Sequence, residues 1–265
     1  MRAKKSLGQN FLRSKTVVNA IINTAGVSSD DTVLEIGPGK GILTKALLEK
    51  GARVIAVEKD GELTACLERE FSGYISEGKL ALVNKDILEI DLSVFDLNPR
   101  KYKLIANIPY YITGQIIRFF LEHDIQPKTM TLMVQKEVAE RIVARGGKES
   151  ILSISVKAYG NPRYIQKVPA RYFKPAPKVD SAIMHINNIS KSVFDQNNIS
   201  ETDFFRLVRA GFSNKRKYLL SNIGNHLKIP ALPQVFEACS ISANTRAEDI
   251  SVSDWVCLAQ QINVK

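Results

Sequence analysis

The sequence predicts an α/β fold in which a mainly parallel sheet, covered by helices on both faces, precedes a small helical domain. Short apolar runs, with the length and composition of buried parallel strands, recur along the first two thirds of the chain. From residue 201 onward the apolar residues recur at helical spacing instead. A chain of 265 residues is long enough for one large domain and one small one.

Seven strands are expected in the first domain, with helices between them. The predicted strands are 32–36, 53–58, 80–84, 102–106, 129–135, 164–168 and 181–186, and the predicted helices include 42–50 and 136–144. Residues 17–22 are too short and polar for a signal segment and instead predict a first amphipathic helix. We expect a first domain over residues 1–187, an Asn- and Ser-rich linker over 188–200 and a helical domain over 201–265.

A glycine-rich turn joins the first predicted strand to its helix. Residues 37–41 read Gly-Pro-Gly-Lys-Gly, and the helix that follows is stopped by Gly51, a residue that tolerates left-handed backbone. The next strand ends in Glu58, whose carboxylate can accept hydrogen bonds from both hydroxyls of a ribose. A plain tight turn is the alternative interpretation of the glycines, but the complete β-α-β pattern favours a cofactor site.

The spacing of the glycines indicates which cofactor fits. A dinucleotide-binding turn has a third glycine where this chain has Ile42, and Pro38 removes one N–H that a pyrophosphate would need. S-adenosylmethionine carries a ribose and an adenine but no phosphate, so it suits this turn better. Asp86, at the end of the third predicted strand, could accept from the adenine amine, although such an Asp is more often a turn former or a helix cap.

The most informative stretch is Asn107-Ile108-Pro109-Tyr110, at the end of the fourth predicted strand. Pro109 keeps the preceding residue out of the helical region, so the chain turns at the sheet edge where α/β folds bind ligands. The tetrapeptide offers an amide oxygen, a carbonyl and an aromatic face, which suit a purine with an exocyclic amine. A strand followed by a simple proline turn is the alternative for these four residues alone.

Taken together, the motifs resemble those of the ribosomal RNA adenine N6-dimethyltransferases, and most closely the small-subunit (16S) branch of that family. The matching stretches span nearly the whole chain and are 5–12, 35–41, Glu58, Asp86, 107–113, 173–181 and 211–217. Lys40 departs from the family, where an apolar residue is usual, and Asn214 stands where Gln or Arg is more common. The resemblance implies a Rossmann-like class I S-adenosylmethionine-dependent methyltransferase sheet with a small C-terminal helical domain.

The resemblance also implies a role for each matching residue. The implied cofactor-binding residues are Asn10, Leu12, Gly37, Gly39, Glu58, Asp86 and Asn107, with Asn10 and Leu12 in a segment that folds over the cofactor. The implied catalytic residues are Asn107, Pro109, Tyr110 and Phe173, with the two rings on either face of the target adenine. Without the family, Phe173 would be interpreted as a core aromatic residue before a Pro-rich turn.

The charge of the chain suits a nucleic-acid partner. There are 37 Lys and Arg residues against 27 Asp and Glu, a formal net charge of +10, although an anionic membrane would also attract such a chain. The candidate RNA-binding residues are Lys4, Lys5 and Arg13 near the N-terminus, and Arg206, Arg209, Lys215, Arg216 and Lys217 in the last domain. Each cluster could instead be a solvated face, and the last domain a plain helical cap.

Other features limit the range of functions. No apolar stretch approaches the ~20 residues of a membrane span, and His123, His185 and His226 have no metal-binding spacing, so no metal is expected. Three widely spaced cysteines, Cys66, Cys239 and Cys257, predict reduced thiols in a cytoplasmic protein.

We therefore expect a monomeric enzyme that binds a 16S rRNA or small-subunit precursor, and neither DNA nor membrane. Two alternatives stay open: a 23S rRNA adenine methyltransferase of the macrolide-resistance type, and a non-catalytic small-subunit assembly factor. Residues 7–12 and 111–113 favour the small-subunit branch over the first alternative. The intact set of candidate site residues argues against the second.

Overall fold

The computed structural model describes Lys4 and residues 7–262. Its strands are β1 (Phe11–Leu12), β2 (Thr32–Ile36), β3 (Arg53–Glu58), β4 (Leu80–Asn84), β5 (Tyr102–Asn107), β6 (Thr129–Gln135), β7 (Asn161–Val168), β8 (Phe173–Lys174) and β9 (Ser181–Asn187). Its helices are α1 (Lys15–Ala25), α2 (Ile42–Glu49), α3 (Gly61–Glu70), α4 (Ser72–Ser76), α5 (Thr113–Glu122), α6 (Lys136–Ile142), α7 (Ile151–Lys157), α8 (Ser192–Asn197), α9 (Glu201–Gly211), α10 (Leu219–His226), α11 (Leu232–Ala238) and α12 (Val252–Ile262).

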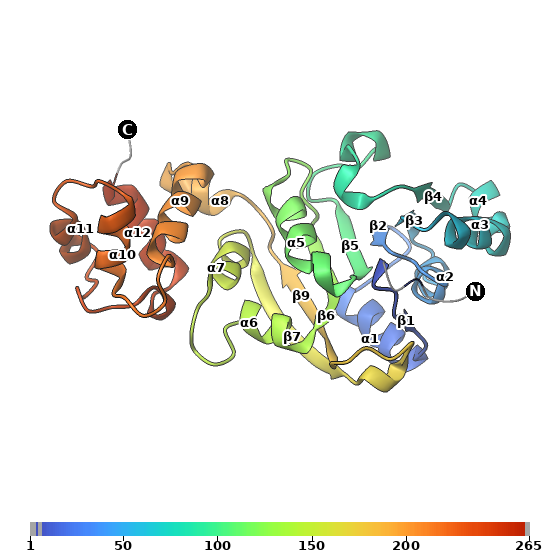
Figure 1. Cartoon of the computed structure of the whole chain (residues 1–265). Helices are drawn as coiled ribbons and strands as arrows, with labels where there is room; N and C mark the ends of the chain where they lie inside the picture. The colour runs from blue at the N-terminus through green and yellow to red at the C-terminus, as the bar shows by residue number, and fades with distance from the viewer. Residues whose placement is uncertain (1–3, 5–6, 263–265) are drawn as a thin grey trace. The chain divides into compact units, whose positions relative to one another are not determined.

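The main sheet confirms the predicted α/β fold. Seven of the described strands pair in the order β4-β3-β2-β5-β6-β9-β7, and these are the seven strands predicted from the sequence (Figure 1). The first five are parallel to one another, whereas β9 runs antiparallel to both β6 and β7. The strand order reverses between β2 and β5, so the carboxyl ends of β2, β3 and β5 meet at the switch point where such sheets bind ligands.

Helices cover both faces of this sheet. Val33, Val54 and Ile105 point to one face because alternate residues of a strand share a side, and there they belong to a buried apolar cluster with residues of α1 and α2. In Figure 1, α5 lies over the other face, to which it presents a buried apolar side that includes Phe120. This packing holds the strand ends, and the turns that follow them, in fixed positions.

A second, two-stranded sheet was not predicted from the sequence. β1 and β8 pair antiparallel, with Leu12 opposite Phe173 and Phe11 opposite Lys174. Strands of two residues are too short to give a periodic pattern, which is why sequence reasoning missed them. The pairing ties the N-terminal segment, residues 7–12, to the Pro-rich loop that precedes β9.

The contacts divide the chain into two units, and the division is not continuous along the sequence. One unit comprises residues through Ala139 together with Asn161–Ile189, and the other comprises Glu140–Gly160 together with Ser190–Lys265. Residues 140–160, which the sequence-based boundaries assign to the first domain, pack with the second unit. The stretch expected to be a linker instead contains helix α8. Its Phe194 is buried against the rings of Tyr159 and Phe204, so this stretch is part of the second unit's core.

One expectation about the cysteines is wrong. Cys239 and Cys257 form a disulfide, with their Cα atoms 5.8 Å apart, while Cys66 is free and exposed. Helices α11 and α12 pack together and bring the two residues into contact across a sequence separation of 18. Spacing along the sequence gives no sign of that packing, so the expectation of three reduced thiols could not foresee the bond.

Candidate active site

A cavity of about 280 Å³ opens at the carboxyl ends of β2, β3 and β5. Its lining includes every residue predicted to bind the cofactor, namely Asn10, Leu12, Gly37, Gly39, Glu58, Asp86 and Asn107. Pro109 and Tyr110 line it as well. The structure thus brings together residues that lie as much as a hundred positions apart in the sequence.

The glycine turn leaves space for a ligand beside the backbone. Gly37 has a φ of +66°, and a Cβ added there would find only the Asn107 carbonyl oxygen within 4 Å, at 3.9 Å. Gly41 begins α2 with a φ of +75°, and a Cβ there would meet Phe71 at 2.7 Å. Gly37 therefore faces open cavity, whereas Gly41 is required by the close approach of helix α2 to its neighbour.

Glu58 is a buried carboxylate held by backbone groups at the end of β3. Its Oε2 accepts from the Gly39 N–H at 3.1 Å, and its Oε1 accepts from the Asp60 N–H at 2.9 Å. Burial raises the pKa of Glu58 above its usual value, and the two backbone hydrogen bonds counteract that rise. A ribose diol in the cavity would give this carboxylate two further donors.

Asp86 caps the turn after β4 and forms an ion pair. Its Oδ1 accepts from the Leu88 N–H at 3.1 Å, and its Oδ2 lies 2.7 Å from Lys59 Nζ. Lys59 holds the pKa of Asp86 below its usual value, so the carboxylate is charged at neutral pH. Asp86 is thus the cap anticipated from the sequence. Its carboxylate oxygens still have lone pairs that could accept from an adenine amine.

The Asn107–Tyr110 turn directs its polar groups with the help of distant partners. Asn107 Nδ2 donates to the Asn10 carbonyl at 3.2 Å, which leaves Oδ1 available as an acceptor. The Tyr110 hydroxyl lies 2.6 Å from Ser181 Oγ, and burial raises the pKa of Tyr110. The Pro109 carbonyl accepts from the Ile112 N–H at 3.2 Å and keeps a second lone pair.

Phe173 lies apart from the cavity lining. Its side chain is 4% exposed and belongs to the apolar cluster that also contains Leu12, Val168 and Ile183. Its backbone pairs with Leu12, a residue that does line the cavity. The structure therefore places Phe173 in the apolar core beside the N-terminal segment, and its contact with the target adenine stays a prediction.

Glu35 is a buried carboxyl group that the sequence analysis did not assign to the site. It is 1% exposed, lines the cavity, and its Oε2 has no hydrogen-bond partner among the described residues. Burial raises its pKa to about 8, and the nearby Glu58 carboxylate adds to the rise. Glu35 is therefore mostly protonated at neutral pH.

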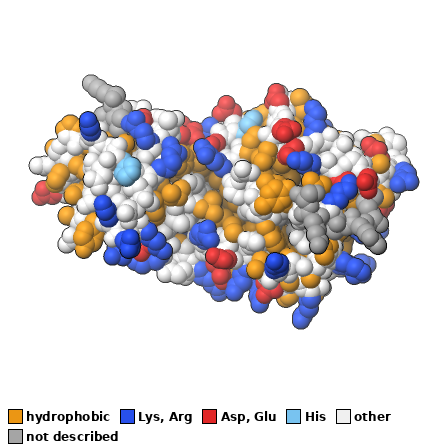
Figure 2. All heavy atoms as spheres, in the orientation of Figure 1, with side chains coloured by type: hydrophobic (Ala, Val, Ile, Leu, Met, Phe, Trp, Pro, Cys, Tyr) orange, Lys and Arg blue, Asp and Glu red, His pale blue; other side chains and the backbone are white. Residues whose placement is uncertain are grey.

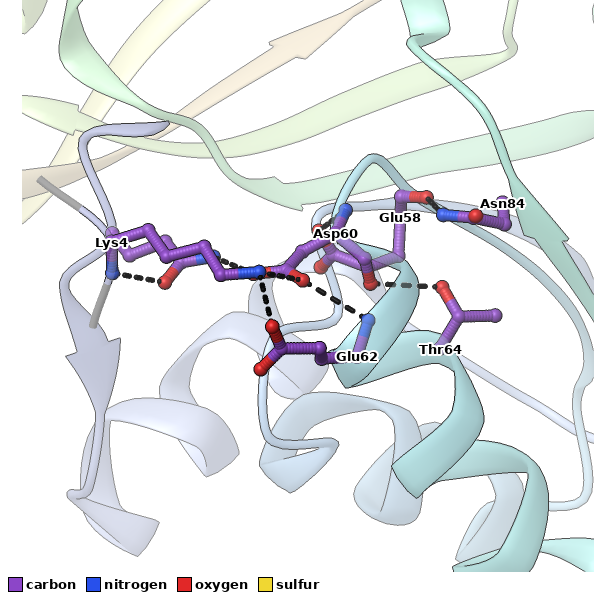
Figure 3. A network of polar contacts seen from close by, with 7 residues as sticks. Lys4, Glu58, Asp60, Glu62, Thr64 and Asn84 are labelled. Carbon is purple, nitrogen blue, oxygen red and sulfur yellow. Dashed lines mark hydrogen bonds and ion pairs between the residues drawn. The ribbon is translucent and has the colours of Figure 1, made fainter. Parts of the chain in front are cut away.

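A polar network anchors Lys4 and the N-terminal segment to the start of α3 (Figure 3). Lys4 Nζ lies 2.7 Å from Asp60 Oδ1 and 3.1 Å from Glu62 Oε1. Gln9 Nε2 donates to Asp60 Oδ2 at 2.8 Å, and the Lys4 N–H donates to Gln9 Oε1 at 2.8 Å. Gln9 belongs to the matched stretch 5–12 but was given no role of its own, and Asp60, two residues after Glu58, was not singled out.

Most of the basic residues predicted to contact RNA are exposed where the structure describes them, whereas Lys4 is half-buried against Asp60 and Glu62. Lys5 lies outside the described residues, and Arg13 is exposed after β1. Arg206 and Arg209 lie on the exposed face of α9, and residues 215–217 form the exposed turn before α10, in a region where Figure 2 shows prominent blue side chains. Asn222, which sequence reasoning also missed, shapes this turn by donating to the carbonyls of Gly211 and Asn214.

The described residues contain neither a helix long and apolar enough to cross a membrane nor a cluster of side chains suited to a metal ion. The open backbone at Gly37, the anchored Glu58 carboxylate and the acceptor at Asp86 fit S-adenosylmethionine. Sheet order and site together define a class I S-adenosylmethionine-dependent methyltransferase.

Comparisons with known proteins identify the family. The family model described as ribosomal RNA adenine dimethylase matches residues 1–263. A Dehalococcoides mccartyi protein named ribosomal RNA small subunit methyltransferase A is 41% identical over 262 residues, which cover 97% of this chain and 88% of that one. The chain belongs to the ribosomal RNA adenine dimethylase family.

Two solved structures resemble the whole chain. A dimethyladenosine transferase from Plasmodium falciparum has a TM-score of 0.81 and 28% identity, covering 96% of this chain and 97% of that one. The 23S rRNA methyltransferase ErmE has a TM-score of 0.74 and 26% identity, covering 96% of this chain and all of that one.

Proposed function

We propose that the protein is a 16S rRNA (adenine-N6,N6)-dimethyltransferase. It transfers methyl groups from S-adenosylmethionine to the exocyclic amines of two adjacent adenosines in the 3′-terminal hairpin loop during small-subunit biogenesis. The observation that carries the proposal is the Asn107–Tyr110 turn at the cavity, where one amide oxygen and one carbonyl are available to a base amine. Family membership and the name of the Dehalococcoides relative support the choice of RNA.

The residues of the turn activate the amine by position and hydrogen bonding. An adenine amine is a poor nucleophile because its lone pair is delocalised into the ring. Hydrogen bonds to Asn107 Oδ1 and the Pro109 carbonyl favour a pyramidal nitrogen and so localise that pair. The Tyr110 ring, held through its hydroxyl by Ser181, provides a surface on which the base stacks.

The chain's remaining site residues hold the cofactor and need not act as bases. When bound, S-adenosylmethionine supplies an electrophilic methyl group on a positively charged sulfur. Glu58 binds the ribose, Asp86 the adenine amine, and Gly37 and Gly39 allow close approach of the methionine end. The target nitrogen becomes acidic as it is methylated, so its proton passes to water.

The partner and location follow from the substrate. The protein binds a small-subunit precursor through the exposed basic residues, acts in the cytoplasm and works as a monomer. The similarity to ErmE keeps a 23S rRNA substrate as a second candidate. A non-catalytic assembly factor would not require the intact acceptor set at Asn107 and Pro109.

The test is methyl transfer from isotope-labelled S-adenosylmethionine to unmethylated small subunits, with large subunits as the control. Nucleoside mass spectrometry of the labelled RNA identifies the product. N6,N6-dimethyladenosine in small-subunit RNA alone is expected. Label only in large-subunit RNA would overturn the 16S assignment, and no label despite cofactor binding would favour the assembly factor.

A further inference from the structure

The N-terminal segment, Leu7–Leu12, lines the cavity and is held by its C-terminal end and by Gln9. All six of its residues line the cavity. Its C-terminal end pairs with β8, and the Arg13 N–H after it donates to the Tyr172 carbonyl at 2.9 Å. Through Gln9 the segment contacts Asp60.

Asp60 binds two donors that belong to or flank this segment. It is 4% exposed, with Gln9 Nε2 at 2.8 Å from Oδ2 and Lys4 Nζ at 2.7 Å from Oδ1. Burial acts to raise the pKa of Asp60, but the hydrogen bonds from Lys4 and Gln9 outweigh it and the pKa lies below its usual value. A charged carboxylate makes both hydrogen bonds stronger than neutral ones.

Asp60 is itself fixed to the cofactor site. Its backbone N–H donates to Glu58 Oε1 at 2.9 Å, and its side chain caps α3 by accepting from the Glu62 N–H at 3.1 Å. The backbone of Asp60 is thus fixed by Glu58, the proposed ribose-binding carboxylate two residues before it, and by the start of α3. Lys4 is coupled to the segment, because its N–H donates to Gln9 Oε1 at 2.8 Å and its carbonyl accepts from the Leu7 N–H at 3.1 Å. Movement of Gln9 away from Asp60 would therefore disturb the Lys4 contact as well.

The segment in turn orients the Asn107 amide. The Asn10 carbonyl, one residue after Gln9, accepts from Asn107 Nδ2 at 3.2 Å. Were the amide reversed, Oδ1 would face that carbonyl oxygen and two acceptors would oppose each other. The position of the Asn10 carbonyl therefore decides which end of the amide is available to a base.

We propose that Asp60 is a positioning residue for methyl transfer. By holding Gln9 and Lys4 it fixes the N-terminal segment, and the Asn10 carbonyl of that segment keeps Asn107 Oδ1 available to the target amine. This inference rests on the proposed function, since it concerns the amine acceptor of the same site. It also gives Lys4 a different role from the RNA contact expected from the sequence, because its amine already has two carboxylate partners.

The experiment compares Asp60→Asn and Lys4→Ala with the wild type. Asn is also a good helix cap, so the first variant keeps the start of α3 while losing the charge. Lys79→Ala is the matched control, since it breaks an exposed ion pair with Glu77 (2.9 Å) in the same unit. Hydrogen exchange of residues 7–12 and single-turnover methyl transfer at saturating cofactor and subunit are measured for each.

Both variants are expected to exchange faster in residues 7–12 and to transfer methyl groups roughly tenfold more slowly, which corresponds to about 1.4 kcal/mol. The Lys79→Ala protein should match the wild type in both measurements. Lys4→Arg should restore most of the rate, and the Lys4→Ala, Asp60→Asn double variant should be no slower than Asp60→Asn alone.

Three results would overturn the role of Asp60. The first is unchanged hydrogen exchange of residues 7–12 in Asp60→Asn, and the second is an unchanged methyl-transfer rate of Asp60→Asn at saturation. The third is a Lys4→Ala variant in which only the salt dependence of ribosome binding decreases, as it would if Lys4 contacted phosphate. A wild-type protein that methylated no ribosomal RNA would instead overturn the proposed function. The exchange comparison would still decide whether Asp60 holds the segment.

Discussion

Single residues of the site depend on partners that are far away in the sequence. Asn107 donates to the Asn10 carbonyl and the Tyr110 hydroxyl bonds with Ser181, so each side chain proposed to face the base is held by a segment outside its own turn. Such contacts reduce the freedom of the side chains before substrate binds. Geometry of this kind contributes to rate chiefly by making reorganisation unnecessary during the reaction.

Replacement of Asn107 by Ala should lower turnover far more than it lowers affinity for RNA. The change removes one acceptor for the amine and no contact with phosphate, so single-turnover methyl transfer should fall roughly a hundredfold or more. Ribosome binding measured in parallel should stay within about twofold. An unchanged transfer rate would rule out the acceptor role of Asn107.

The buried carboxyl of Glu35 should make stability depend on pH. Its pKa of about 8 lies above the ordinary 4.5, so between these values the folded state holds a proton that the unfolded state has lost. The free energy of unfolding therefore falls as pH rises through this window, by at most about 1.4 kcal/mol per unit. In Glu35→Gln the free energy of unfolding, measured by denaturant titration at pH values from 5 to 8, should fall less with pH than in the wild type.

Two other groups also contribute to the pH dependence: Glu58, whose raised pKa acts in the same direction as that of Glu35, and His185. Burial lowers the pKa of His185, so it contributes in the opposite direction, with stability that increases as pH rises toward 6.5. The difference between the wild type and Glu35→Gln at each pH cancels these contributions. A difference that did not change with pH would contradict the raised pKa of Glu35.

At the level of elements, the basic turn between α9 and α10 is held by hydrogen bonds from a buried side chain, while its charged side chains are exposed. Asn222 is 2% exposed and holds the turn through the Gly211 and Asn214 carbonyls, whereas Lys215 and Arg216 are exposed. A fixed turn places its cations at defined positions. That is the arrangement expected for contacts with a phosphate backbone.

Neutralising this turn should weaken ribosome binding in a salt-dependent way. Lys215→Gln with Arg216→Gln removes two cations, so the slope of log affinity against log salt should decrease by roughly two. Lys228→Gln, at another exposed position of the same unit, is the control and should change the slope little. If the double variant had the same slope as the wild type, residues 215 and 216 would be part of a solvated face that does not contact RNA.

The elements also show what could be read from the sequence. All seven strands of the main sheet were predicted, and the five parallel ones were the clearest because buried parallel strands appear as apolar runs. Glycine and proline located the turns at Gly37 and Pro109 because these residues have narrow conformational uses. The β1–β8 pair, Asp60 and Ser181 were missed because their importance lies in contacts between distant segments, which leave no local pattern.

At the level of the whole molecule, the disulfide between Cys239 and Cys257 stabilises the second unit. Closing a loop of this length removes chain entropy from the unfolded state, worth about 3 kcal/mol. A reducing agent should lower the free energy of unfolding by up to that amount. The single tryptophan, Trp255, is buried in this unit and reports its unfolding by fluorescence.

Two variants complete that measurement. Cys239→Ser should match the reduced wild type and be insensitive to reductant, whereas Cys66→Ser should behave as the wild type because Cys66 is free and exposed. Equal stability of the oxidised and reduced proteins would show that packing of α11 on α12 suffices.

The discontinuous second unit has a consequence for synthesis of the chain. Residues 140–160 are translated before their partners: Ile154 and Val156 of α7 are fully buried, and α7 packs against α9, which begins at Glu201. At roughly 5–20 residues per second, the ribosome needs a few seconds to supply α9. For that interval the nascent chain carries an apolar helix without its partner, and this is the stage at which a chaperone that binds exposed apolar segments would have its substrate.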